Sequence, residues 1–175
     1  MALPRDYVGQ RCSVARALEI VGERWTLLIV RDAFYGLRRF GDFALHLEIP
    51  RAVLTSRLKA LVDEGVMERV PGPGAARDEY ALTEKGERLW PVVRELMHWG
   101  DDHYSPDGPR RIFRHSQDDG LIGAGGRCAT CRALVVAADT TVTAGPGFEP
   151  GAPTEEPALL AFQTERRLLE PARCA

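Results

Sequence analysis

Residues 50–82 decide the fold, and they read PRAVLTSRLKALVDEGVMERVPGPGAARDEYAL from Pro50 to Leu82. The first part predicts a helix, because its leucines recur at helical spacing and a proline suits the first helical position. Gly65 ends that helix. Two short runs, 66–70 and 78–82, flank a Pro/Gly-rich loop and predict two strands. The stretch therefore predicts a helix, a glycine stop and a β-hairpin with a basic tip.

The order of helix, stop and hairpin is that of a winged helix, which presents one helix and one loop to DNA. Binding of phosphates needs positive potential, and a net charge of −2 argues against a basic surface over the whole chain. From Gly36 to Ala60, however, five cations stand against two carboxylates, a local balance of +3. Positive charge is thus concentrated on the predicted helix and just before it.

The composition is that of an ordinary globular protein. The 175 residues suffice for one domain with a tail or for two small domains, and 45% are hydrophobic and 27% charged. No apolar run approaches the length of a membrane span, and the N-terminus lacks the apolar core of a signal peptide. The four cysteines, of which two form a C-x-x-C pair, fit a secreted disulfide framework poorly. We therefore expect a cytoplasmic protein that does not contact a membrane.

Apolar periodicity predicts the remaining elements. The expected helices span 14–21 (with Ser13 as its N-cap), 24–35, 38–47 and 84–102, the last broken near Pro91, and a final helix spans 155–169. The expected strands of the second half are 111–115, 133–137 and 140–143, between linkers 105–109 and 145–153. The predicted fold class is α+β and mainly α. It comprises a winged helix-turn-helix domain at 1–104, then an extension at 105–175 with short strands and a C-terminal helix.

Six segments between Cys12 and Trp99 occur in the order and spacing of a known family. They are CSVARALE (12–19), GERWTLLIVRD (22–32), RRFGDF (38–43), VLTSRLKAL (53–61), GVMER (65–69) and YALTEKG (80–86). With these segments the chain resembles the HxlR family, a branch of the MarR-like winged-helix transcription regulators. The resemblance covers a little over half of the chain.

The resemblance implies a homodimer that reads a pseudo-palindromic operator in double-stranded DNA. The family dimer is joined through the N-terminal segment and the long helix after the wing, and each protomer reads one half-site. Arginine suits bidentate contact with guanine, and hydroxyl groups suit base edges or phosphates. The candidate DNA-binding residues are Arg38, Arg39, Arg51, Thr55, Ser56, Arg57, Lys59 and, in the wing, Arg77. The alternative for each of them is a solvated surface side chain.

Cys12 occupies a position at which many members of this family carry a cysteine beside the dimer interface, and in several branches it senses oxidants or electrophiles. Arg11 and Arg16 lie nearby in sequence. A helix N-terminus also lowers the pKa of a thiol. Cys12 is therefore a candidate redox sensor, with a small packed core residue as the alternative.

Cys128-Ala-Thr-Cys131 has the ligand spacing of a zinc knuckle. Two further ligands are needed, and His115, Asp118 and Asp119 are available. Longer chains similar to this family have a tail of the form His…Cys-Gly…Cys-x-x-Cys-Gly. Here Asp119 takes the first cysteine position, and Arg132 replaces the glycine after the pair. A zinc site of His115, Cys128 and Cys131 is one hypothesis. A redox dithiol and a packed pair without metal are the others.

The leading functional hypothesis is a sequence-specific DNA-binding transcription regulator, a homodimeric repressor that responds to a small molecule or a redox signal. One alternative keeps the winged-helix shape but uses the exposed helix to bind a protein. The other is a zinc-dependent enzyme that uses His115, Cys128 and Cys131. The sequence lacks the nucleophile elbow, the P-loop and the H-E-x-x-H motif, as well as the H-x-E and P-C-x-x-C elements of zinc deaminases. We therefore expect no catalytic residues.

Overall fold

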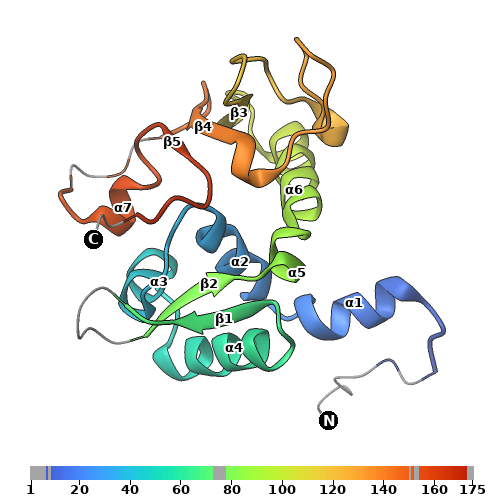
Figure 1. Cartoon of the computed structure of the whole chain (residues 1–175), viewed down its shortest axis with the longest axis vertical. Helices are drawn as coiled ribbons and strands as arrows, with labels where there is room; N and C mark the ends of the chain where they lie inside the picture. Colours follow the sequence, from blue (N-terminus) through green and yellow to red (C-terminus); the bar gives the residue numbers. More distant parts are fainter. Residues whose placement is uncertain (1–6, 8, 73–77, 150, 152–153, 173–175) are drawn as a thin grey trace.

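The computed structural model describes residues 7, 9–72, 78–149, 151 and 154–172, which form helices and two small antiparallel sheets (Figure 1). The first part contains α1 (Ser13–Val21), α2 (Thr26–Phe34), α3 (Phe40–Leu47), α4 (Arg51–Asp63), β1 (Met67–Val70), β2 (Glu79–Leu82), α5 (Glu84–Glu87) and α6 (Trp90–Tyr104). The second part contains β3 (Arg111–His115), η1 (Ala124–Gly126), η2 (Ala137–Asp139), β4 (Thr140–Ala144), α7 (Pro157–Leu160) and β5 (Arg166–Arg167). The predicted class, α+β and mainly α, is confirmed. No helix in the described ranges is long and apolar enough to cross a membrane.

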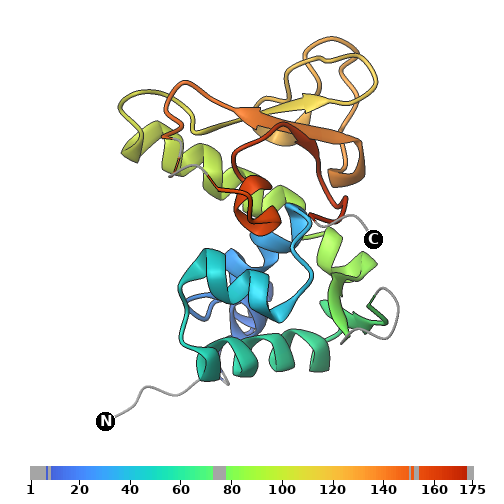
Figure 2. The ribbon, with the colours of Figure 1, turned by 90° about the vertical axis from the view of Figure 1, so that its left-hand side faces the viewer.

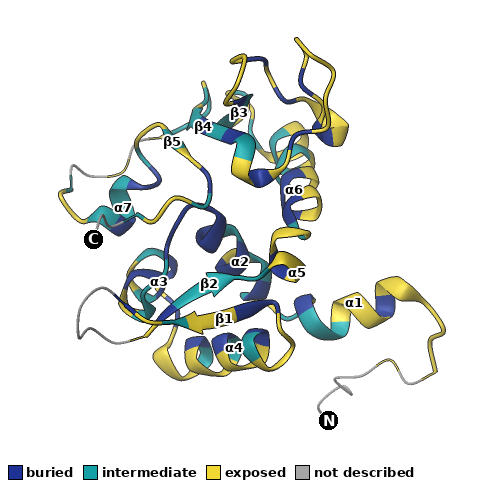
Figure 3. Cartoon of the chain, in the orientation of Figure 1, coloured by how far each residue is buried: buried dark blue, intermediate teal, exposed yellow. Residues whose placement is uncertain are grey.

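The helices of the first part match their predicted positions because one face of each is apolar. Helix α2 lies at the centre, where Ile29, Val30 and Phe34 are completely buried. Helix α4 buries Leu54, Leu58 and Leu61 against this core, at the helical spacing that the sequence shows. The remaining face of α4 is exposed along the edge of the molecule (Figure 3).

Strands β1 and β2 form the antiparallel hairpin of the wing. Met67 pairs with Leu82 at its base, and Val70 pairs with Glu79 nearest the tip. Gly65 has a φ of 65°, the left-handed conformation that lets the chain leave α4 and enter β1 directly. The predicted tip residue Arg77 lies outside the described residues.

The predicted break in the helix after the wing is confirmed. Thr83 caps α5 by accepting a hydrogen bond from Gly86 N–H at 3.2 Å. Helix α5 ends at Glu87, and α6 begins at Trp90 with Pro91 in its first turn. A proline is tolerated in that turn because its position needs no backbone N–H donor within the helix.

Two predictions for the extension are wrong. Strands β3 and β4 are confirmed, but residues 133–137 form only a single bridge, Arg127 to Leu134, because no neighbouring strand continues the pairing. The expected helix 155–169 is limited to α7, Pro157–Leu160. The chain then turns, and β5 pairs with β4 through Arg166 and Val142. Leu169 has a φ of 68°, which is incompatible with a continuing α-helix.

The extension lies over the end of the winged helix opposite α4, with α7 beside α3 (Figures 1 and 2). One apolar core runs through both parts and includes Phe34 and Trp90 together with Phe113 and Phe162. Leu169 N–H donates to Phe34 O at 2.7 Å, which fixes the C-terminal segment to the end of α2. This arrangement leaves the exposed face of α4 uncovered by the extension.

Candidate nucleic-acid interface

Helices α3 and α4 form a helix-turn-helix unit. Glu48 takes a left-handed φ of 50° between them, and Pro50 stands directly before α4. Because the buried leucines fix the rotation of α4, its other face is fixed as well. That face exposes Arg51, Ala52, Thr55, Ser56, Lys59 and Ala60. Four of the predicted DNA-binding residues therefore lie on a single exposed surface.

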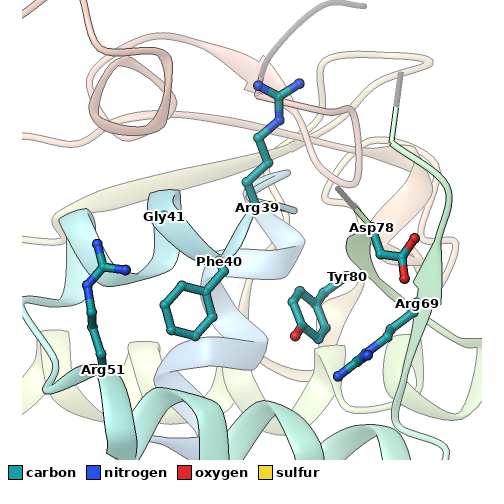
Figure 4. A pocket seen from close by; sticks show the side chains of 7 residues that line it. All are labelled: Arg39, Phe40, Gly41, Arg51, Arg69, Asp78 and Tyr80. Atoms are coloured by element: carbon teal, nitrogen blue, oxygen red, sulfur yellow. The ribbon is translucent and has the colours of Figure 1, made fainter. Parts of the chain in front are cut away.

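A groove of about 830 Å³ opens between α3, the start of α4 and the wing (Figure 4). It is lined by Arg39, Phe40, Gly41, Arg51, Arg69, Asp78 and Tyr80. The Arg51 guanidinium lies 5.7 Å from the centre of the Phe40 ring, and that of Arg69 lies 5.7 Å from the centre of the Tyr80 ring. Cation–π contacts of this kind hold guanidinium groups without neutralising their charge.

Carboxylates balance part of the predicted positive charge. Arg39 Nε lies 2.9 Å from Glu79 Oε1 at the wing, and Lys59 pairs with Asp63 one turn along α4. The Lys59–Asp63 pair is exposed on both sides and therefore weak. Arg39 is 42% exposed, whereas its partner Glu79 is buried, so this pair is held more firmly.

Two arginines lie less openly than the sequence suggests. The Arg57 side chain is only 20% exposed and contacts Glu23 at 3.0 Å. Arg57 therefore faces the segment before α2 and has to leave Glu23 to reach DNA. Arg38 is half-buried, and its carbonyl accepts a hydrogen bond from Tyr80 N–H at 2.8 Å. The ion pair with Glu23 favours a positioning role for Arg57 within the winged helix.

Arg69 is the groove residue that the sequence analysis missed. It lies on β1, where it is exposed and pairs across the hairpin with Tyr80. The sequence did contain a signal for Arg69. Residues two apart on a strand lie on the same face, so Arg69 shares the face of the buried Met67 but stands nearer the wing tip. Strand positions on a wing can reach phosphates just as helix positions reach base edges.

Cys12, rather than the predicted Ser13, is the N-cap of α1. Its thiol is exposed. Hydrogen bonding from the backbone amides of Ala15 and Val14 lowers the pKa of the Cys12 thiol. A lowered thiol pKa at an accessible helix N-terminus is the environment of a reactive cysteine.

A second group of side chains gathers in the extension, far in sequence from the groove. The ligand atoms of His115, Asp118, Cys128 and Cys131 all lie within 4.8 Å of one another. Hydrogen bonds from Cys131 and from Gly120 N–H hold the pKa of the Asp118 carboxyl well below its usual range. Asp119 lies elsewhere, with an 81% exposed side chain that pairs with Arg114 at 3.3 Å. The structure thus brings together the three predicted ligands and selects Asp118 over Asp119 as the fourth member.

A helix-turn-helix whose second helix is exposed, followed by a hairpin wing and a groove lined with arginines, defines a winged-helix DNA-binding protein. The model of the HxlR-like helix-turn-helix family matches residues 20–108. The chain belongs to this family, and it is a transcriptional regulator rather than an enzyme. DNA is the partner that membership implies.

Relatives support the assignment along much of the chain. The HTH-type transcriptional regulator Rv3095 of Mycobacterium tuberculosis is 46% identical over 144 residues, which cover 78% of this chain and 88% of the relative. YdeP of Bacillus subtilis, also an HTH-type transcriptional regulator, is 33% identical over 115 residues, covering 65% of this chain and 88% of YdeP. The crystal structure of PA1607, named as a candidate transcription factor, matches with a TM-score of 0.60 at 37% identity and covers 74% of this chain and 92% of PA1607.

Proposed function

We propose that this regulator binds a pseudo-palindromic operator in double-stranded DNA as a homodimer and represses transcription. Helix α4 enters the major groove, where Arg51, Thr55, Ser56 and Lys59 face the base edges. Arg39 and Arg69 contact phosphates on either side of the groove, and the wing tip with Arg77 follows the adjacent backbone or minor groove. Arg38 contacts a phosphate near the start of α3, and Arg57 holds the winged helix in its binding shape.

The observation that carries the proposal is the groove beside the exposed face of α4. Arg39, Arg51 and Arg69 line it from the start of α3, from α4 and from β1, and their side chains point in different directions (Figure 4). Their charge is local, so the overall net charge of −2 does not oppose it. A groove bordered by three arginines next to an exposed helix is suited to a polyanion that carries both phosphates and readable base edges.

Two exposed apolar faces support the homodimer. Val92, Leu96 and Trp99 recur at helical spacing on α6 and are 46%, 50% and 55% exposed. Val14 and Leu18 on α1 are 63% and 42% exposed, and α1 points away from the rest of the chain (Figure 1). Helix faces of this kind are costly to leave in water and are suited to pairing with a second copy.

The signal is proposed to act outside the reading surface. An oxidant or electrophile modifies Cys12 next to the dimer faces, or a small-molecule effector binds between the winged helix at 1–104 and the extension at 105–175. We propose that the protein acts in the cytoplasm, where reduced thiols and DNA are both present. The redox proposal fails if Cys12→Ser leaves the release of DNA by oxidants or quinones unchanged.

Salt dependence of DNA binding tests the proposal. If Arg39 and Arg69 of both protomers each contact one phosphate, these contacts give log K a slope of about −4 against log salt. Loss of Arg69 in both protomers reduces this slope by about 2 units. Loss of Arg51 instead relaxes sequence preference if Arg51 reads a base, with about 1–3 kcal/mol lost per base contact.

The assay is fluorescence anisotropy with the DNA upstream of the regulator's own gene and with a scrambled duplex. Arg51→Ala and Arg69→Ala are compared with Arg88→Ala, which removes a 79% exposed arginine directly after α5 that pairs with Glu84 outside the groove. We expect only the first two variants to weaken binding. Equal binding by all three, with little dependence on salt, indicates instead that α4 binds a protein. A promoter fusion then gives the sign of regulation, and higher expression without the regulator is the result expected of a repressor.

A further inference from the structure

The cluster in the extension has the dimensions of a tetrahedral metal site. Zinc lies about 2.0–2.3 Å from nitrogen, oxygen and sulfur ligands, so ligand atoms at the corners of a tetrahedron stand about 3.3–3.8 Å apart. Cys128 Sγ lies 3.2 Å from Asp118 Oδ1, and Cys131 Sγ lies 3.4 Å from His115 Nδ1. His115 Nδ1 lies 3.2 Å from Asp118 Oδ1. All of the pairs lie within 4.8 Å, so shifts of about 1 Å or less place the four atoms around one ion.

The backbone around the two cysteines is that of a zinc knuckle, although the expected glycine is missing. Arg132 follows Cys131 and adopts a φ of 65°, which costs a residue with a side chain about 1–2 kcal/mol. Arg132 N–H donates to Cys128 O at 3.0 Å, and Cys128 N–H donates to Ala133 O at 2.9 Å. A tight turn kept at the expense of this strain points to a function for the turn.

Gly120 closes the cluster on its other side. A Cβ atom there would lie 2.3 Å from Cys128 Sγ and 3.0 Å from Asp118 Oδ1. A side chain at this position would therefore displace the Cys128 thiol or the Asp118 carboxylate. Gly120 N–H also donates to Asp118 Oδ1 at 3.0 Å and orients the carboxylate toward the sulfur atoms. Outer hydrogen bonds of this type orient metal ligands.

We propose that His115, Asp118, Cys128 and Cys131 bind one zinc ion in a closed tetrahedral site that fastens the segment 116–135 to β3. Two sulfurs with one imidazole nitrogen favour zinc over magnesium, calcium or manganese. Four protein ligands leave no open position for a substrate, so the site is structural. Binding releases the protons of the two thiols to solvent as the zinc–sulfur bonds form, with no change of oxidation state.

The segment fastened by zinc rests on α6, the helix that follows the wing. Gly126 packs so closely on α6 that a Cβ atom would lie 2.1 Å from a guanidinium nitrogen of Arg94. Gly125 N–H donates to Glu95 Oε1 at 3.1 Å. Zinc thus orders a segment that contacts the same helix whose exposed face is proposed to pair in the dimer.

The test uses the full-length protein purified under reducing conditions. Metal is counted by mass spectrometry, and Co²⁺ replaces zinc to report geometry through its visible absorption. We expect one zinc per protomer, and a Co²⁺ spectrum with the intense bands of a tetrahedral site and a sulfur-to-metal charge-transfer band. Asp118→Ala weakens zinc affinity by at least the roughly 10- to 100-fold that loss of an outer-shell partner costs, and Cys128→Ser abolishes the charge-transfer intensity of one thiolate.

The matched controls are Asp119→Ala, which removes the neighbouring exposed carboxylate, and Cys12→Ser, which removes a thiol outside the cluster. Both are expected to retain one zinc. If Cys128→Ser does not fold, the zinc affinity of Asp118→Ala, a change on the exposed side of the cluster, tests the proposal instead. The proposal is overturned if the wild-type protein takes up no zinc, if Asp118→Ala and Asp119→Ala bind zinc equally, or if intact mass shows a Cys128–Cys131 disulfide in the freshly purified protein. The experiment measures zinc binding and not DNA binding, so failure of the zinc proposal is distinguishable from failure of the proposed operator binding.

Discussion

Replacement of Phe162 by alanine tests whether the extension packs on its own winged helix in solution. The Phe162 ring is 9% exposed and lies between two rings of the first part. Its centre is 3.6 Å from that of His46 on α3 and 4.7 Å from that of Tyr35 at the end of α2. The Arg31 guanidinium lies 5.7 Å from the same ring. The alanine variant removes all of these contacts at once.

The expected loss of stability follows from this geometry. Truncation of a buried phenylalanine to alanine costs about 3–5 kcal/mol, including the cavity that remains. Stacked aromatic neighbours contribute about 0.5–1.5 kcal/mol beyond burial. Phe162 lies at the rim of the core, where neighbours can relax into the space, so we expect a loss near the lower end, about 3 kcal/mol. With a urea m value of about 2–3 kcal/mol per molar, the midpoint falls by about 1–1.5 M.

Equilibrium unfolding in urea, followed by tryptophan fluorescence and circular dichroism, measures the midpoint. Leu134→Ala is the control, because Leu134 lies in the same extension but is 65% exposed, and such substitutions cost about 0.5 kcal/mol or less. Each protein is measured at two concentrations to separate unfolding from dimer dissociation. A midpoint shift no larger than that of the control would refute the packing of Phe162 on α3. A shift that grows with dilution would place the ring on the partner subunit.

Two further predictions concern other parts of the chain. Gly36→Ala should destabilise the fold by at least about 1–2 kcal/mol, because Gly36 has a φ of 85° and a Cβ atom there would lie 1.8 Å from Glu170 O. Thermal unfolding measures the loss, and an unchanged Tm contradicts the prediction. Iodoacetamide at neutral pH should modify Cys12 before Cys131, since backbone amides lower the pKa of the exposed Cys12 thiol whereas Cys131 is held as a ligand in the proposed zinc site. Because more of Cys12 is then thiolate, its rate should level off at a lower pH than that of an ordinary thiol. Peptide mass spectrometry measures alkylation at both cysteines, and equal rates would count against Cys12 as the more reactive thiol.

The first half of the fold could be predicted because local and tertiary preferences agree there. The inward leucines of α4, Leu54, Leu58 and Leu61, follow a helical period, and Gly65 supplies the left-handed residue that ends the helix. Pro91 marks the break before α6 for a similarly local reason. Such signals depend on near neighbours in sequence, which a single chain displays directly.

The second half could be predicted less well because long-range contacts decide it. Leu168 and Leu169 fit a helical pattern, yet Leu168 N–H pairs with Thr140 O and Leu169 N–H with Phe34 O, partners that no local spacing indicates. The same limit affected the candidate sites. Asp118 and Asp119 are adjacent in sequence, and only the turn after β3 shows which one faces the cysteines. Arg57 looked available because Glu23 lies far away along the chain.

The contact between Phe162 and His46 joins the extension to the reading surface. His46 lies on α3, the helix that positions α4, and its Nδ1 is 2.8 Å from Oδ2 of the buried Asp32. His46 contacts Asp32 on one side and Phe162 on the other. The position of α3 therefore depends on whether the extension is docked. A ligand that bound only the docked extension would therefore strengthen binding of the proposed operator, and by linkage the operator would strengthen binding of that ligand by the same factor.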